Sequence, residues 1–215
     1  MKSIILYLGG NGPCVLPEHI DLATVTKVLA ADSGIELAQQ HNIKTDLLVG
    51  DLDSISKNAL ASAKESGVEI LSYNKDKDQT DFELALEEVK KIDIEHLIII
   101  GGGGQRTDHL LANLSVLAGT QTKEYFTDIY FVEEILYVCR SNQPRKLKIE
   151  NGSTVSLIPI NGSVSGVTTI GFKWELENAT LDSSYSLGVS NINIKEHVEI
   201  EIKSGFLLIV VQNNY

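Results

Sequence analysis

The sequence predicts an α/β protein of two domains. An α/β domain with a mostly parallel sheet is expected at residues 1–142, and a small all-β sandwich at residues 143–215. In the first part, short apolar runs without polar alternation, typical of buried parallel strands, alternate with helical patterns. The helical periodicity ends near Pro144, and from there glycines separate short strand-like runs.

The first part contains five apolar runs that we expect to form strands. A capping-box pattern at residues 33–36 marks one helix start, residues 80–83 with Thr80 as the N-cap mark a second, and a third helix is expected after Arg106. Alternating strands and helices predict right-handed crossovers, which gives a Rossmann-like arrangement. The expected strands are residues 4–8, 27–31, 46–49, 68–71 and 96–100.

The second part reads as strands throughout. Glycines at intervals of a few residues separate these runs, which favours a sandwich or barrel. Residues 128–132 and 135–140 are expected to bridge the two parts. The expected strands of the second part are residues 147–149, 155–158, 164–170, 173–176, 198–202 and 206–211.

Charge and composition exclude several classes of function. The chain has 215 residues, with 18 Lys and Arg against 29 Asp and Glu, so its formal net charge is -11. This balance argues against nucleic-acid and anionic-membrane partners, which both need clustered basic residues. Cys14 and Cys139 are too few for a disulfide framework. No apolar run approaches the ~20 residues of a membrane span, so we expect a soluble, cytoplasmic protein.

Acidic residues follow successive predicted strands at their carboxyl ends, where ligands bind in open parallel sheets. Asp32 ends the second strand, Asp51 and Asp53 follow the third, and Asp81 comes after the fourth. Like charges at one edge repel, so the arrangement favours a bound cation. Two carboxylates one residue apart suit Mg²⁺. Turn formation and helix capping, which also favour Asp, are the competing explanation.

Two glycine-rich turns follow predicted strands. Residues 101–104 are all glycine and precede Arg106 and Asp108 at a predicted helix start. Backbone N–H groups in such a run can approach an anion, and the planar guanidinium of Arg106 suits phosphate. The run matches neither the Walker pattern nor Gly-x-Gly-x-x-Gly. The turn at residues 9–12 is expected to be either another phosphate or adenine contact or a plain turn.

Three motifs occur in a particular order: Gly-Asp-Leu-Asp-Ser at residues 50–54, Asp-Gln-Thr-Asp-Phe-Glu at 78–83, and Arg-Thr-Asp-His-Leu-Leu-Ala-Asn at 106–113. Together they resemble the thiamin pyrophosphokinase (thiamine diphosphokinase) family. The resemblance implies a nucleotide-binding catalytic domain, a thiamine-binding β-sandwich, and a homodimer with active sites at the subunit interface. It also implies transfer of a pyrophosphoryl group from ATP to the hydroxyl of thiamine, which gives thiamine diphosphate and AMP.

Carried over residue by residue, the resemblance implies a role for each motif residue. Asp51, Asp53 and Asp81 would hold Mg²⁺ on the ATP phosphates. Catalytic roles would fall to Asp81, Arg106 and Asp108, with Asp81 or Asp108 as the hypothetical acceptor of the hydroxyl proton. Contacts to ATP are implied for Gly10, Asn11, Asp32, Lys77, Gly103, Arg106, His109 and Asn113. Contacts to thiamine are implied for Asp81, Asp108, Trp174, Ser190 and Asn191.

Some alternatives stay open from sequence. Trp174 offers an aromatic face that suits a cationic thiazolium or a pyrimidine ring, but a place in the sandwich core explains it equally well. The chain as a whole could act on a pterin alcohol, or it could be a non-catalytic nucleotide or thiamine sensor. The array of metal-type carboxylates argues against a sensor, because binding alone does not need it.

Overall fold

The computed structural model describes residues 1–74, 78–104, 106–119 and 125–212. The chain divides into two compact units. The α/β unit comprises residues 1–116 and 121–132, and the sandwich unit comprises residues 117–120 and 133–215. Within the described ranges, every helix is too short or too polar to cross a membrane.

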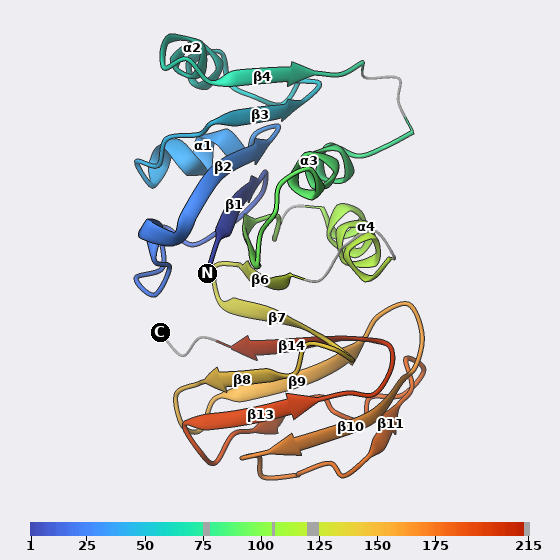
Figure 1. The fold of residues 1–215 in the computed structure, drawn as a ribbon. Coiled ribbons are helices and arrows are strands. Elements are labelled where there is room, and N and C mark those ends of the chain that lie inside the picture. Colours follow the sequence, from blue (N-terminus) through green and yellow to red (C-terminus); the bar gives the residue numbers. More distant parts are fainter. Residues whose placement is uncertain (75–77, 105, 120–124, 213–215) are drawn as a thin grey trace. The chain divides into compact units, whose positions relative to one another are not determined.

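The α/β unit is built on a parallel sheet with strand order β6-β5-β1-β2-β3-β4 (Figure 1). The first strand, β1, pairs in parallel with β2 on one side and with β5 on the other. All six residues of β1 are buried, which explains its unbroken apolar run. The strands are β1 Ser3–Leu8, β2 Val25–Ala31, β3 Leu47–Gly50, β4 Glu69–Ser72, β5 His96–Gly101 and β6 Phe126–Tyr130.

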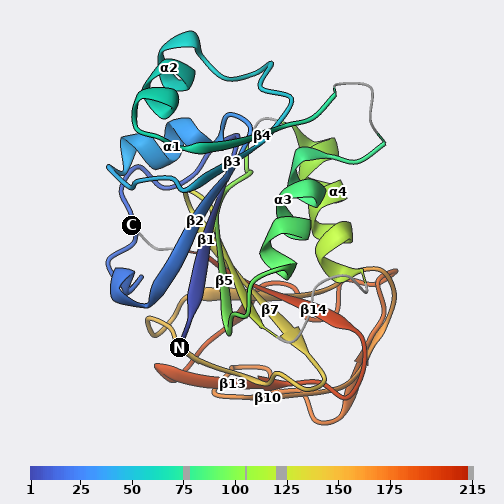
Figure 2. The ribbon, with the colours of Figure 1, turned by 45° about the horizontal axis from the view of Figure 1, so that its top comes forward.

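Helices cover both faces of this sheet. Figure 2 shows α1 and α2 on one face and α3 and α4 on the other. The five strands expected in this part are all present, with ends shifted by one or two residues. The helix α2 was not expected from the sequence. The helices are α1 Gly34–Gln40, α2 Lys57–Glu65, α3 Asp81–Lys90 and α4 Thr107–Ala118, with a short 3₁₀ turn η1 at Leu22–Thr24.

The N-cap predicted at Thr80 is confirmed, as part of a full capping box, and the capping box predicted at residues 33–36 is wrong. At α3, the Glu83 backbone N–H donates to Thr80 Oγ1 at 3.2 Å, and the Thr80 N–H donates to Glu83 Oε2 at 2.9 Å. At α1, the Ser33 side chain makes no capping hydrogen bond. The Glu36 carboxylate instead accepts a hydrogen bond of 2.8 Å from the backbone N–H of Ser56. Glu36 therefore ties α1 to the loop before α2.

The sandwich unit is entirely antiparallel. Strands pair in the order β12-β9-β14-β7, and a separate four-stranded sheet has the order β11-β10-β13-β8. The strand expected at residues 173–176 is wrong, because residues 173 and 174 form a bend and residues 175 and 176 are irregular. The strands β11 and β12 were not expected. The strands are β7 Glu134–Arg140, β8 Arg145–Lys148, β9 Thr154–Pro159, β10 Val164–Ile170, β11 Ala179–Leu181, β12 Asn191–Ile192, β13 His197–Glu201 and β14 Phe206–Gln212.

A single hydrophobic core joins the two strand sets of the sandwich unit. Inward-facing residues alternate with exposed ones along β8 and β13, as expected for strands with one solvated face. This confirms the all-β second part. The buried cluster draws Val155, Leu157, Leu207 and Ile209 from one set and Leu147, Val164, Val198 and Ile200 from the other.

The close approach of α1 to β1 depends on one glycine. A Cβ at Gly34 would lie 2.3 Å from the backbone oxygen of Tyr7, near the carboxyl end of the buried strand β1. We expect Gly34→Ala to lower the free energy of unfolding by about 2–3 kcal/mol, because helix and strand would have to separate. Urea denaturation would measure this loss.

Gly67→Ala is the matched control. A Cβ at Gly67 meets nothing within 4 Å, but its φ is +71°, so only backbone strain applies. We expect a loss of about 1 kcal/mol for this variant. Equal losses in the two variants, or wild-type stability in Gly34→Ala, would contradict close packing at α1.

Candidate functional site

Loops at the carboxyl edge of the parallel sheet bring acidic side chains together. Carboxylate oxygens of Asp32, Asp51 and Asp53 all lie within 4.8 Å of one another. These three residues, with Asp81 beside them, are called the carboxylate cluster below. The spacing suits ligands of one divalent cation, which oxygen donors of this kind prefer.

The backbone turns sharply to place these carboxylates. Asp32 still pairs with β3, since its N–H donates to the Val49 oxygen at 2.9 Å, but its φ is +48°. The chain therefore leaves the sheet at this residue, and Asp is among the few side chains that tolerate this left-handed conformation. Leu52, between the two clustered aspartates, has a φ of +66°. The N–H of Asp53 donates to Asp51 Oδ1 at 3.1 Å, which stabilises the turn.

Asp81 reaches the cluster from the start of α3. A Cβ at Gly50 would lie 3.2 Å from Asp81 Oδ1 and 3.3 Å from Asp32 Cβ, so these two side chains meet over the glycine. The Thr80 capping box fixes the first turn of α3 and with it the position of Asp81. Gly50 leaves the space that this meeting requires.

Burial and like charge make Asp32 costly to ionise. Burial raises the pKa of Asp32, the hydrogen bond from Ser54 lowers it, and the charges of Asp81 and Asp51 raise it further. The Ser54 hydroxyl donates to Asp32 Oδ2. The other oxygen, Asp32 Oδ1, is buried without a hydrogen-bond partner among the described residues. A buried, unpartnered carboxylate oxygen is suited to a cation.

The two glycine turns lie side by side at the point where the strand order changes direction. Residues 9–12 follow β1, and residues 101–104 end β5 and continue beyond it. Asn11 and Gly103 exchange two backbone hydrogen bonds, of 2.8 and 3.2 Å. A Cβ at Gly104 would lie 2.3 Å from the Asn11 side-chain nitrogen, and φ there is +78°. The close approach of the turns therefore requires glycine.

Arg106 and Asp108 pair with each other before and within the first turn of α4. Arg106 Nη2 donates to Asp108 Oδ2 at 2.6 Å, and Nε donates to Oδ1 at 3.2 Å. This pairing lowers the pKa of Asp108 to about 2. Both side chains are more than 60% exposed, so the pair exchanges readily with other partners. His109 is exposed and Asn113 half-buried on the same helix, and Lys77 lies outside the described residues.

In the sandwich unit, the two expected thiamine segments meet at Trp174. The Asn191 side chain accepts from the Trp174 N–H at 3.2 Å and donates to the Trp174 oxygen at 2.7 Å. Asn191 is 6% exposed, so it holds the tryptophan backbone in place. The Trp174 side chain is 54% exposed and lies outside the core. Its ring contacts a cation, with Lys173 Nζ 4.6 Å from the ring centroid, and Ser190 is exposed beside Asn191.

Sequence reasoning missed Ser54 and the full part played by Asp32. Asp32 was expected near the nucleotide, whereas its carboxylate lies within the acidic cluster. Ser54 follows Asp53 directly, but its hydroxyl bonds a carboxylate 22 residues earlier in the chain. A serine next to paired aspartates was the available signal. Its partner becomes evident only once β2 and β3 are neighbours.

Replacing the Asp32 charge should stabilise the metal-free protein. Because the folded protein raises the pKa of Asp32, its carboxyl group stays neutral at low pH and costs no stability there. As pH rises through the folded-state pKa, the group ionises in its buried place and the free energy of unfolding falls. We therefore expect Asp32→Asn to have a higher thermal midpoint than wild type in EDTA at neutral pH. The difference should shrink as pH falls. Differential scanning calorimetry at several pH values would measure it.

Ser54→Ala serves as the control for this prediction. It removes the hydrogen bond that favours the charged carboxylate, so it should lower the thermal midpoint at neutral pH. If Asp32→Asn were less stable than wild type in EDTA, Asp32 would not be under electrostatic strain.

Comparison with known proteins gives the family. The family model for thiamin pyrophosphokinase, catalytic domain, matches residues 22–129. A second model, for the vitamin B1 binding domain of thiamin pyrophosphokinase, matches residues 143–207. Thiamine pyrophosphokinase of Bacillus subtilis (strain 168) is 27% identical over 216 residues, which cover 98% of each chain. Thiamine pyrophosphokinase 1 of Oryza sativa subsp. japonica is 24% identical, over 80% of this chain and 67% of the relative.

Solved structures have the same fold. The thiamine pyrophosphokinase from Bacillus subtilis superposes with a TM-score of 0.83 at 22% identity, over 100% of both chains. The thiamin pyrophosphokinase from Candida albicans gives a TM-score of 0.79 at 14% identity, over 99% of this chain and 89% of the other. Since the two family models together match most of its length, the chain belongs to the thiamin pyrophosphokinase family.

Proposed function

We propose that this chain transfers the pyrophosphoryl group of ATP to the hydroxyl of thiamine, giving thiamine diphosphate and AMP. The carboxylate cluster is the main observation in support of this function. It occurs in the same unit as the two glycine turns, in a chain that belongs to this family. Transfer of this kind depends mainly on positioning and charge stabilisation, so it needs no covalent nucleophile. Neither a pterin acceptor nor a sensor role finds support among the relatives.

The carboxylate cluster would hold Mg²⁺. We assign the ligands to Asp51, Asp53 and Asp81, and add Asp32, because its carboxylate lies among them with an unpartnered oxygen. All four offer the oxygen donors that this ion prefers. When bound, Mg²⁺ supplies positive charge against the phosphates of ATP. The carboxylates keep that charge at one edge of the sheet, and Ser54 orients Asp32.

The paired glycine turns would receive the nucleotide. They follow β1 and β5, where the strand order reverses, and such switch points are where open α/β sheets bind ligands. This supports a Rossmann-like character for the unit. We assign nucleotide contacts to Gly10, Asn11 and Gly103, with His109 and Asn113 from α4. Lys77, outside the described residues, remains a proposed phosphate contact.

Arg106 and Asp108 would change partners when substrates bind. The exposed ion pair is weak in water, so its guanidinium can turn to phosphate at little cost. Asp108, released from Arg106, is then an exposed anionic partner for a cationic thiazolium. Asp81 or Asp108 is the proposed group that accepts the hydroxyl proton.

Thiamine would contact Trp174 and Ser190 of the sandwich unit, with Asn191 holding the Trp174 backbone. We propose residues 1–142 as the nucleotide-binding part and residues 143–215 as the thiamine-binding part. A homodimer with active sites at its interface is proposed too. It is supported by the apolar side chains Tyr185, Leu187, Val189 and Ile194, all exposed in one stretch of the sandwich unit. We also propose a cytoplasmic location, in keeping with two free cysteines.

AMP release from Mg²⁺ and ATP, with and without thiamine, tests the function directly. We expect thiamine-dependent AMP and an equal amount of thiamine diphosphate, and a loss of at least about 100-fold in Asp51→Asn. Saturable binding of thiamine without release of AMP would show that the chain is a sensor and not an enzyme. AMP release that depends on a pterin alcohol would overturn the choice of acceptor.

Trp174→Ala should weaken the binding of thiamine and leave the binding of ATP unchanged. Because an exposed aromatic face binds a cation with modest energy, we expect the KM for thiamine to rise about 10-fold, with the KM for ATP unchanged. Steady-state kinetics would measure both constants. Trp174→Phe should recover most of the affinity. A change in the KM for ATP alone would contradict the assignment.

Arg106→Gln should separate catalysis from stability. The Arg106–Asp108 pair is exposed, so we expect an unchanged thermal midpoint but a fall in kcat/KM of about 100-fold or more. Thermal denaturation and steady-state kinetics of the same preparation would test both. Full activity in Arg106→Gln would remove this residue from the site.

A further inference from the structure

We propose that Gln40 and His41, at the end of α1, are positioning residues for the glycine turn at residues 9–12. Both bond the stretch of chain that directly follows this turn. Gln40 Nε2 donates to the Cys14 oxygen at 2.9 Å. His41 Nε2, from the C-cap of α1, donates to the Pro13 oxygen at 2.8 Å. The role rests on the proposed function, in which this turn receives the nucleotide.

The His41 ring connects the end of the turn to the buried strand β1. Its Nδ1 lies 3.1 Å from the hydroxyl oxygen of Tyr7, which is fully buried. The Pro13 carbonyl oxygen can only accept, so His41 Nε2 carries the hydrogen and, in the neutral ring, Nδ1 accepts from Tyr7. Burial raises the pKa of Tyr7, which keeps this hydroxyl a donor. The bonds from Tyr7 through His41 to Pro13 therefore join the interior of the sheet to the residue after the turn.

The glycine turn is held from two sides. On one side, Asn11 exchanges backbone hydrogen bonds with Gly103. On the other side, a Cβ at Gly12 would lie 2.5 Å from Leu37 Cδ2, so α1 packs directly against the glycine. A glycine-rich turn that nothing held would have to be ordered when a ligand binds, which costs affinity. The bonds from the end of α1 reduce this cost and should strengthen nucleotide binding.

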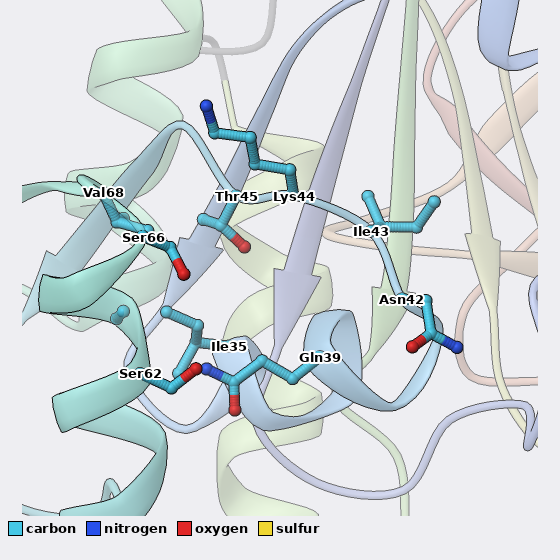
Figure 3. A pocket seen from close by; sticks show the side chains of 10 residues that line it. Ile35, Gln39, Asn42, Ile43, Lys44, Thr45, Ser62, Ser66 and Val68 are labelled. Atoms are coloured by element: carbon cyan, nitrogen blue, oxygen red, sulfur yellow. The ribbon is translucent and has the colours of Figure 1, made fainter.

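Gln39, the neighbour of Gln40, makes the same kind of bond in a different direction. Its Nε2 donates to the Ala59 oxygen of α2 at 3.1 Å. Gln39 also lines the pocket drawn in Figure 3, where its side chain extends from α1 toward α2. Two adjacent glutamines thus fasten α1 to two different parts of the unit, and of the two it is Gln40 that bonds the chain after the turn. Gln39 is therefore a matched control for Gln40.

Calorimetric titration with Mg²⁺ and a non-hydrolysable ATP analogue tests this role. We expect Gln40→Ala and His41→Ala to bind the analogue about 5-fold more weakly than wild type, because each loses a hydrogen bond that orders the turn. Gln39→Ala should bind it as wild type does. His41→Gln should recover most of the affinity, because its amide can donate to the Pro13 oxygen from the place of Nε2. Gln40→Ala changes an exposed side chain, so it should keep the thermal midpoint of wild type.

Hydrogen exchange of the nucleotide-free protein gives a second readout, which does not depend on the proposed function. The Asn11 N–H donates to the Gly103 oxygen at 2.8 Å. Measured by NMR, this N–H should exchange about 5-fold faster in Gln40→Ala and in His41→Ala, because the turn opens more often. Gln39→Ala should leave the rate unchanged.

Three results of the titration would overturn the inference: wild-type affinity in both Gln40→Ala and His41→Ala, an equal loss in Gln39→Ala, or no recovery in His41→Gln. An unchanged exchange rate of the Asn11 N–H in Gln40→Ala and His41→Ala would overturn it too. A wild-type protein that binds no analogue would instead contradict the proposed function, while faster exchange in the two variants would still support a turn held by α1.

Discussion

Repulsion among clustered carboxylates is the constraint on which the α/β unit depends. Oxygens of three aspartates lie within 4.8 Å of one another, and the fold holds them there without a basic side chain in the cluster itself. The restraints come from the backbone and from uncharged groups: the left-handed turn at Asp32, the Ser54 hydroxyl and the Thr80 capping box. Each restraint orients an acidic group that would otherwise turn toward water. The cluster therefore stores electrostatic strain, which the proposed cation would relieve.

The glycines of the unit serve the same edge of the sheet in a different way. Gly50 leaves room for Asp81 to meet Asp32, and the turns after β1 and β5 approach each other closely enough to exchange backbone hydrogen bonds. Side chains at these positions would separate the strands' carboxyl ends. A compact, acid-lined edge next to two glycine turns suits a cation-bound phosphate ligand.

Much of this could be predicted from the sequence, and the limits have physical causes. Long apolar runs such as that of β1 predict buried strands, and the paired aspartates after β3 predict a gathering of carboxylates, because both signals are local. The missed helix α2 has few apolar residues and buries only Ala59 and Ala63, so its pattern is weak. The Ser54–Asp32 bond joins residues far apart in sequence. The bend at residues 173 and 174 depends on Asn191, whose side-chain amide bonds the Trp174 backbone in place of a partner strand.

The central claim is that the carboxylate cluster binds a cation. The most direct test is to measure Mg²⁺ binding through the thermal midpoint. For wild type, Mg²⁺ in excess over EDTA should raise the thermal midpoint, by about 2.7 kcal/mol of stabilisation at 100 times the dissociation constant. In Asp51→Asn the rise should largely disappear, while Asp78→Asn, an exposed aspartate outside the cluster, should respond as wild type does. Equal responses in wild type and Asp51→Asn, or no response in wild type, would contradict a cation held by the carboxylate cluster.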